Sequence, residues 1–379
     1  MASCVHDDLK ALLEHLCGVL DAVRREEIED RHMRALNWEP IDRPPVVMTL
    51  PEPEELRFVP YPHGETFDSP EKMLFNELTY AFNTSIASRD ILGDDLPCTI
   101  RANFGTVVIA SIFGAAIERA EDNPPWVRRS DGAGSLSALL DRDPTDFSQG
   151  WAPRVVETHQ YFRSVLAEYP ELQKTIRVVL PDLQGPFDNL EIIVGSDLFS
   201  ELLASEDLVS RALEATATAQ IGLARHLAPL VSDGPDGFAH QHAVMIKGRI
   251  LLRLDSVILM SPEMYRNIVA PHDQRVLQEL GAGGVHSCGN VGRHVGEFLK
   301  LPSVCCLDLG QSELNEINTL YTQLKDRRMP LTRLKVSRDD LATGRVAERF
   351  PTGVSFVYEA ACVRDAAETM EAYVRVTNN

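Results

Sequence analysis

The sequence lacks the features that identify membrane-spanning and secreted proteins. No stretch of its 379 residues reaches the ~18 uninterrupted apolar residues that a membrane-spanning helix requires. The first residues mix acids and histidines with leucines, so they form no apolar signal segment. The 7 cysteines are odd in number and irregular in spacing, which is typical of reduced thiols. We therefore expect a cytoplasmic protein without a membrane span.

Positive charge and glycine-rich loops are also scarce. The chain has 37 Lys and Arg residues against 56 Asp and Glu residues, a formal net charge of −19. An acidic surface repels phosphate backbones and anionic lipids, and no basic cluster offsets it. Neither G-x-G-x-x-G nor G-x-x-x-x-G-K occurs, which argues against a dinucleotide fold or a phosphate-binding loop. Nucleic acid and membranes are not expected partners.

What the sequence does contain is a repeated alternation of short apolar runs and amphipathic segments. Helices are expected at 69–90, 152–168, 261–280 and 363–375. The expected strands are 46–48, 98–102, 176–180, 250–254, 284–286, 304–309, 331–336 and 354–358. Repeated βα units require a parallel sheet covered by helices. The count of strands predicts an α/β protein, a (β/α)8 TIM barrel.

Two segments depart from this alternation. In residues 7–36 leucines and valines recur at helical spacing, so residues 1–42 are interpreted as an N-terminal helical extension and 43–379 as the barrel domain. In 98–118 the apolar runs 106–109 and 115–117 flank Phe113-Gly114, which predicts a β-hairpin insertion over one mouth of the barrel.

Polar side chains gather where the expected strands end. The carboxyl ends of barrel strands meet at one mouth, and that mouth holds the active site. The polar residues at these ends are Asp182, Gln184, Asp255, His286, Cys288, Asp308, Gln311, Glu359 and Cys362. We expect several of these side chains to meet.

Among them, His286, Cys288 and Cys362 form a candidate zinc-binding set. One imidazole and two thiolates suit Zn²⁺, and three protein ligands leave the open position of a catalytic site. Such an ion can hold a thiol as thiolate or polarise a leaving group. The alternative is that the His-x-Cys tripeptide arises by chance and binds no metal. Cys362 lies too far along the chain for sequence spacing to show whether it joins the other two residues.

The segment His286-Ser-Cys288-Gly-Asn290, with Cys362 after the last strand, resembles the zinc motif of the uroporphyrinogen decarboxylase-fold superfamily. It is most similar to the zinc-containing corrinoid-dependent methyltransferases, the cobamide methyltransferase and O-demethylase branch. The resemblance covers about residues 30–375 and includes Asp42-Arg-Pro-Pro45, 181–186, and Asp255 followed by Ser261-Pro-Glu263. It implies zinc bound by His286, Cys288 and Cys362.

Two departures from the superfamily narrow the chemistry. The loop after the first strand, 49–55, is acidic and has no arginine, so a porphyrinogen with many carboxylates would be repelled. The late cysteine lies in Glu359-Ala-Ala-Cys362-Val363 rather than in the Cys-Gly context of the branch that methylates coenzyme M. The direction of methyl transfer therefore stays open.

Other residues carry weaker expectations, each with an alternative. Asp255 is a candidate acid or base, or else a helix cap, and Glu359 is a candidate catalytic group or fourth zinc ligand. The candidate substrate-binding residues are Asp182, Gln184, Asn290, Gln311, and His242 with its neighbour His240. The alternative for this second set is ordinary turn and loop structure.

The leading functional hypothesis is zinc-dependent methyl transfer between a small O-, N- or S-methyl substrate and the cobalt of a corrinoid (cobalamin). A separate corrinoid-binding protein is implied, because the chain has no D-x-H-x-x-G motif. Alternatives are methyl transfer from the corrinoid to a thiol, a zinc-independent lyase acting on a small carboxylated substrate, and a non-catalytic binding barrel. A homodimer is compatible with the sequence.

Overall fold

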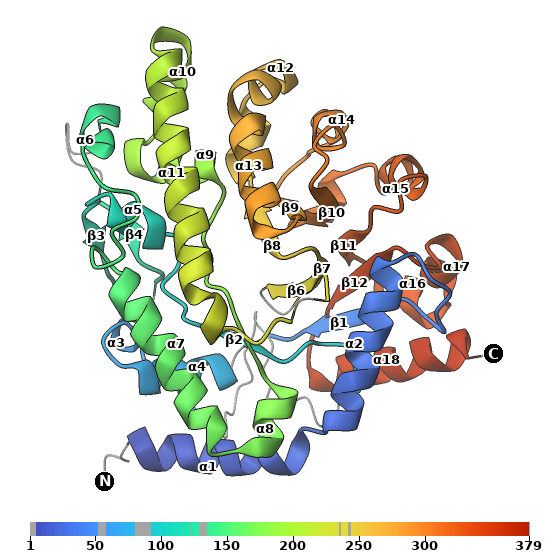
Figure 1. The fold of residues 1–379 in the computed structure, drawn as a ribbon. Coiled ribbons are helices and arrows are strands. Elements are labelled where there is room, and N and C mark those ends of the chain that lie inside the picture. Colours follow the sequence, from blue (N-terminus) through green and yellow to red (C-terminus); the bar gives the residue numbers. More distant parts are fainter. Residues whose placement is uncertain are drawn as a thin grey trace.

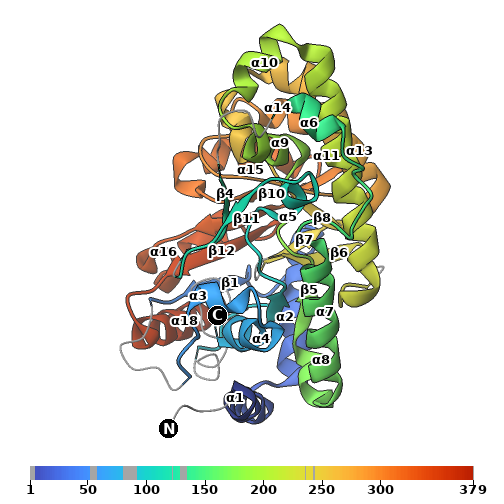
Figure 2. The same ribbon diagram turned by 90° about the vertical axis from the view of Figure 1, so that its left-hand side faces the viewer.

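The structure, a computed structural model, describes residues 5–51, 58–79, 92–121, 123–128, 135–234, 236–241 and 244–378. Within these residues, none of the helices combines the length and the apolar character needed to cross a bilayer. Figures 1 and 2 show strands in the middle of the molecule with helices around them, and α1 lying across one end.

Six parallel strands form the main sheet, in the order β1-β12-β11-β10-β9-β8. They are β1 Val46–Thr49, β8 Ile250–Arg253, β9 Gly283–Ser287, β10 Val304–Leu309, β11 Leu331–Lys335 and β12 Val354–Glu359. Most of their residues are buried, which is typical of parallel strands covered on both faces. β1 pairs with β12, so strands from the N-terminal and C-terminal parts of the chain are neighbours in the sheet.

Two further parallel strands, β2 Thr99–Arg101 and β5 Arg177–Val179, pair with each other. Two backbone hydrogen bonds link the segment before β2 and the loop after β5 to the six-stranded sheet. The Asp95 amide donates to the Val46 carbonyl and the Gly185 amide to the Arg253 carbonyl, both at 2.8 Å. All eight expected strands therefore form and the α/β class is confirmed, although the described ladders do not close into a full barrel.

Helices surround the strands (Figure 1). They are α1 Val5–Val19, α2 Ala22–Leu36, α3 His63–Thr66, α4 Pro70–Thr79, α5 Val108–Ile112, α6 Leu136–Leu140, α7 Ala152–Ala167, α8 Pro170–Thr175, α9 Pro186–Val194, α10 Leu198–Ala204, α11 Glu206–Leu227, α12 Pro262–Met264, α13 Ala270–Leu280, α14 Val295–Phe298, α15 Ile317–Lys325, α16 Arg338–Ala342, α17 Arg345–Arg349 and α18 Val363–Thr377. A π-helical turn, Tyr265–Val269, joins α12 to α13. The helix expected at 69–90 is observed as α4, and 80–91 lies outside the described residues.

The hairpin expected in 98–118 is wrong. That segment holds β2 and then α5, whose five residues are all buried. A β-branched run such as Val107-Val108-Ile109 favours a strand by propensity, but burial on every side suits a short helix equally well, and packing decides. The short hairpin nearby is formed by β3 Ile117–Glu118 and β4 Trp126–Val127.

A second hairpin lies at the amino ends of the strands. Strands β6 Phe238–Gln241 and β7 Val244–Lys247 pack an apolar surface against Leu36, Leu251 and Cys306. His240 belongs to this hairpin, where its Nδ1 lies 2.7 Å from an Asp233 carboxylate oxygen. The expectation that His240 lines the mouth is therefore wrong, because the mouth is at the opposite ends of the strands. His242 lies outside the described residues.

The N-terminal segment forms two helices rather than one. The chain leaves the helical conformation at Asp21, whose side chain caps α2 by accepting the Val23 amide at 2.9 Å. A buried ion-pair network fixes α2 to the sheet. Asp95 is fully buried and accepts from Arg31 at 2.7 Å, from Arg43 through both oxygens, and from the Val46 amide at 3.0 Å. Burial opposes ionisation of Asp95, but the two arginines outweigh it and hold its pKa below the usual range.

Replacing Asp95 by alanine leaves buried guanidinium groups without a partner, so we expect a loss of about 3–5 kcal/mol in the free energy of unfolding. Because the folded-state pKa of Asp95 is lowered, its contribution is present above about pH 4 and decreases as the pH falls further. Urea unfolding at neutral and acidic pH measures both effects. The matched control is Asp30→Ala on α2, whose carboxylate is exposed and 3.8 Å from Arg34. Equal unfolding midpoints for the two variants would contradict this account.

Candidate metal centre

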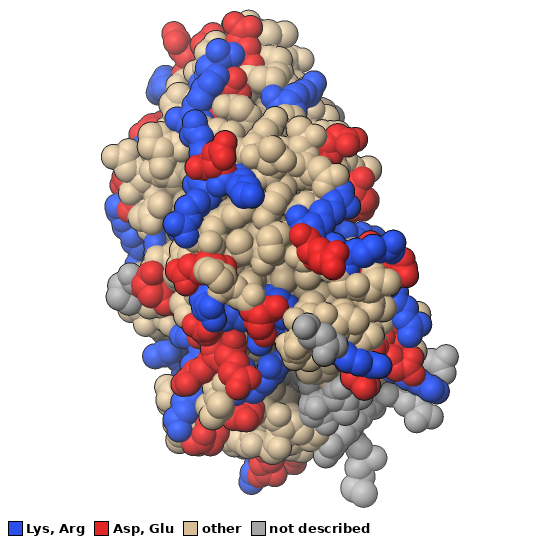
Figure 3. Space-filling model, turned by 90° about the vertical axis from the view of Figure 1, so that its right-hand side faces the viewer, with Lys and Arg blue, Asp and Glu red and all other residues tan. Residues whose placement is uncertain are grey.

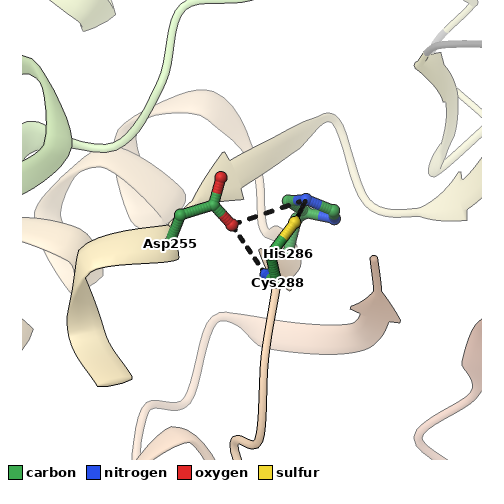
Figure 4. Close-up of side chains that lie close together, drawn as sticks. All are labelled: Asp255, His286 and Cys288. Atoms are coloured by element: carbon green, nitrogen blue, oxygen red, sulfur yellow. Dashed lines mark hydrogen bonds and ion pairs between the residues drawn. The ribbon is translucent and has the colours of Figure 1, made fainter. Parts of the chain in front are cut away.

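Three potential ligands converge where β8 and β9 end. Asp255 follows β8, His286 lies near the end of β9, and Cys288 follows it. The Nε2 atom of His286 is 3.7 Å from Asp255 Oδ1 and 3.7 Å from Cys288 Sγ (Figure 4). The three ligand atoms lie within 4.8 Å of one another, close enough to share one metal ion.

Backbone contacts hold the two strand ends together. The Cys288 amide donates to Asp255 Oδ1 at 2.7 Å, and the Leu254 amide donates to the His286 carbonyl at 2.8 Å. The Ser287 hydroxyl donates to the Leu254 carbonyl at 3.0 Å. Asp255 is thus oriented by the same peptide that carries Cys288.

The orientation of His286 is set by Asp308 on the neighbouring strand β10. The two residues are paired in register, and His286 Nδ1 lies 2.6 Å from Asp308 Oδ2. Arg333 Nη2 also lies 2.7 Å from this Nδ1 atom. In the tautomer whose Nδ1 proton faces Asp308, the Nε2 lone pair faces Asp255 and Cys288. This is the arrangement that a histidine needs in order to bind a metal through Nε2.

Asp308 is in turn held by β11. Thr332 donates to Asp308 Oδ1 at 2.6 Å and Arg333 Nε at 2.9 Å. A shift of register between Leu331 and Leu334 accompanies a φ of +59° at Arg333, and adjacent side chains of β11 consequently both reach Asp308. Burial alone would raise the pKa of Asp308, but Arg333 and His286 hold it far below the usual range.

The protonation of the ligands follows from burial. Burial lowers the pKa of His286, and Arg333 lowers it further, so the imidazole is neutral at pH 7. Burial also raises the pKa of Cys288 to about 11, with Asp255 adding to the effect. A metal ion could therefore bind the neutral imidazole of His286 directly, but it would have to displace a proton from the Cys288 thiol.

A cavity of about 680 Å³ opens beside these residues, a size typical of small-molecule sites. Its apolar lining includes Val47, Leu50, Leu96, Val244, Phe356 and Val357. Its polar lining includes His286, Cys288, Arg253, Arg333, Lys335 and Glu359. The candidate ligands thus lie on the wall of a pocket that is partly apolar and partly cationic.

Of the residues expected at the metal, His286 and Cys288 come together and Asp255 joins them. Cys362 is exposed at the start of α18, where its sulfur accepts the Asp365 amide at 3.5 Å, and it lies outside the cluster. Its role as a ligand stays a prediction. Glu359 does line the cavity, and its carboxylate lies 2.7 Å from Lys335 Nζ.

The expected substrate-binding residues lie around the cavity rather than on its wall. Asp182 and Gln184 are buried, and the Gln184 amide donates to Asp182 at 2.6 Å. Asn290 joins two loops by donating to the Leu314 carbonyl at 2.9 Å. Gln311 is exposed, and its carbonyl accepts from Asn315 at 3.1 Å. Direct contact with substrate stays a prediction for these four residues.

Sequence reasoning missed Arg253 and Arg333, the two arginines on the cavity wall. The position of Arg333 could not be predicted from the sequence, because regular alternation along β11 would turn Thr332 and Arg333 to opposite faces of the sheet. Arg253 is visible only as a charged residue that ends an apolar strand.

The outer surface shows no separation of charge on the face drawn in Figure 3, where Lys and Arg side chains are interspersed with Asp and Glu. That face offers no continuous basic surface for a polyanion. The absence of a nucleic-acid partner stays a prediction.

Comparison with models of protein families gives no match, and comparison with curated protein sequences gives none either. Among solved structures, the chain is similar to a methyltransferase from Methanosarcina mazei, with a TM-score of 0.61 and 18% sequence identity. The similarity covers 93% of this chain and 98% of that one. At this level of identity the likeness establishes a shared fold.

Proposed function

We propose that this protein is a zinc-dependent methyltransferase that moves a methyl group between a small O-, N- or S-methyl substrate and the cobalt of a corrinoid protein. The observation that carries the proposal is the convergence of His286 Nε2, Cys288 Sγ and an Asp255 oxygen on the wall of a cavity of small-molecule size. The shared fold with a methyltransferase supports it.

The donor set fits zinc. Imidazole nitrogen and thiolate sulfur are preferred zinc ligands, and a carboxylate oxygen is accepted as a third. We assign His286 and Cys288 as ligands, with Cys362 as the third. Ala360, two residues before Cys362, lines the same cavity, so the segment that carries this thiol borders the site.

When bound, zinc would supply a Lewis acid that stabilises negative charge on the heteroatom that loses or gains the methyl group. Asp255 lies next to the Cys288 thiol and can take its proton. Asp308 keeps the His286 imidazole in the tautomer and orientation that binding requires. Glu359, paired with Lys335, places a carboxylate on the cavity wall where it can contact substrate.

The partner protein would dock at the carboxyl ends of the strands, which in our proposal complete a closed eight-stranded barrel. Leu259 and Leu314, on the loops after β8 and β10, are 66% and 50% exposed. Apolar side chains exposed next to a site favour contact with another protein. These loops border the candidate ligands, so docking there would bring the corrinoid to the cavity.

The metal assignment predicts about one zinc per chain, measured by inductively coupled plasma mass spectrometry after zinc loading and removal of excess metal. We expect His286→Ala and Cys288→Ser to lose stoichiometric zinc, while Cys17→Ser, an exposed cysteine on α1, retains it. Loss of zinc in Cys362→Ser but not in Asp255→Ala identifies the third ligand as the late cysteine. Full occupancy in the His286 and Cys288 variants would refute the site.

A carboxylate that orients a ligating histidine is worth roughly 10- to 100-fold in metal affinity. We expect Asp308→Asn to weaken zinc binding by that amount in competition with a chromophoric chelator. The control is Asp339→Asn, which changes an exposed carboxylate on α16. Unchanged affinity in Asp308→Asn would show that Asp308 does not act through the imidazole.

Methyl transfer is tested by adding candidate methyl donors and thiol acceptors to this enzyme and a corrinoid protein, and by following the cobalt absorbance bands. We expect a change of the bands with wild-type enzyme and about 100-fold slower change with His286→Ala, on the scale of losing one charge-stabilising group. The donor that methylates Co(I), or the acceptor that demethylates the corrinoid, gives the direction. Full methyl transfer by zinc-free enzyme in chelator would contradict the zinc dependence, and unchanged bands with every donor and acceptor would favour the lyase alternative.

A further inference from the structure

We propose that the methyl-bearing small molecule carries a carboxylate, and that this group binds the Arg253 guanidinium on the cavity wall. The inference rests on the proposed methyl transfer and narrows its substrate class to small monocarboxylates with an otherwise apolar body.

Arg253 lies immediately beside the candidate metal ligands. It ends β8 and is paired in register with His286 on β9. Neighbouring strands are about 4.8 Å apart, and both residues line the same cavity. A small molecule that contacts Arg253 can therefore also reach the metal site.

The guanidinium of Arg253 is buried and only partly satisfied. Its side chain is 6% exposed, and its Nε donates to Asp182 Oδ1 at 2.7 Å. Its Nη2 atom is buried and has no hydrogen-bond partner among the described residues. A guanidinium stays protonated in a protein, so a buried N–H without an acceptor carries a desolvation penalty. An incoming anion that accepts from this N–H would remove that penalty.

Three of the neighbouring acids already pair with cationic side chains. The Asp182 oxygen that pairs with Arg253 also accepts from Gln184 at 2.6 Å, and its other oxygen lies 3.9 Å from Arg101. Asp308 is bound by Arg333, and Glu359 by Lys335. One further carboxylate, brought by a ligand, would complete the pairing of the arginines on this wall.

The rest of the cavity favours an apolar body. Its apolar lining residues are Val47, Leu50, Leu96, Val244, Phe356 and Val357. Apolar side chains stabilise a bound hydrocarbon surface by roughly 25 cal/mol per Å² buried. A single carboxylate can pair with the unpartnered Nη2 of Arg253, while the apolar part of the lining would have to desolvate any charge placed against it.

The test measures binding without any corrinoid protein. Isothermal titration of the wild-type enzyme, before and after zinc loading, compares benzoate, cyclohexanecarboxylate and hexanoate with their neutral amides. We expect at least one carboxylate to bind roughly 10-fold or more tightly than its amide, as for a charge-assisted hydrogen bond. Arg253→Met should abolish this preference, whereas Arg225→Met, on the exposed end of α11, should keep it.

Since Arg253→Met leaves Asp182 without its arginine, the double variant Asp182→Asn/Arg253→Met is measured alongside, and circular dichroism checks its fold. Loss of the preference in either folded variant supports the proposal. Equal binding of acids and amides to wild type, no binding of any carboxylate, or a preference that survives in the variants would overturn it. Zinc content and methyl transfer are scored separately, so a preference lost in the variants of an enzyme inactive in methyl transfer would refute the function and leave the carboxylate site standing.

Discussion

The candidate site depends on one buried carboxylate. Asp308 on β10 accepts from His286 on β9 and from Thr332 and Arg333 on β11, so three neighbouring strands are joined through a single side chain. A buried charge is tolerated only when it is paired and hydrogen-bonded, and here the same bonds that satisfy Asp308 also orient the imidazole. The stability of this part of the sheet and the orientation of His286 for metal binding therefore depend on the same hydrogen bonds.

The strands and the location of the site could be predicted from the sequence because both follow from local rules. Short apolar runs between helical segments gave all eight strands, and polar residues at strand ends gave His286 and Cys288 as neighbours. The segment 98–118 could not be predicted in this way. Its β-branched residues fit a buried helix as well as a buried strand, and only the surrounding packing decides which of these forms.

The rest of the site depends on contacts between strands that no local pattern encodes. Asp255 is close to Cys288 because an amide of one strand end bonds the carboxylate of the other. Arg333 reaches Asp308 only because the register shifts along β11. Cys362 follows β12, and its sulfur accepts from the Asp365 amide at the start of α18, so its place among the metal ligands stays a prediction.

The hairpin of β6 and β7 bears on how the proposed methyl transfer would proceed. It packs against Leu251 of β8 and Cys306 of β10, and Val244 of β7 also lines the cavity beside the candidate ligands. In the proposed function, the small molecule and the corrinoid protein would both approach from the carboxyl ends of the strands. A docked protein would then block the path of the small molecule, and its dissociation would limit turnover as much as the chemical step.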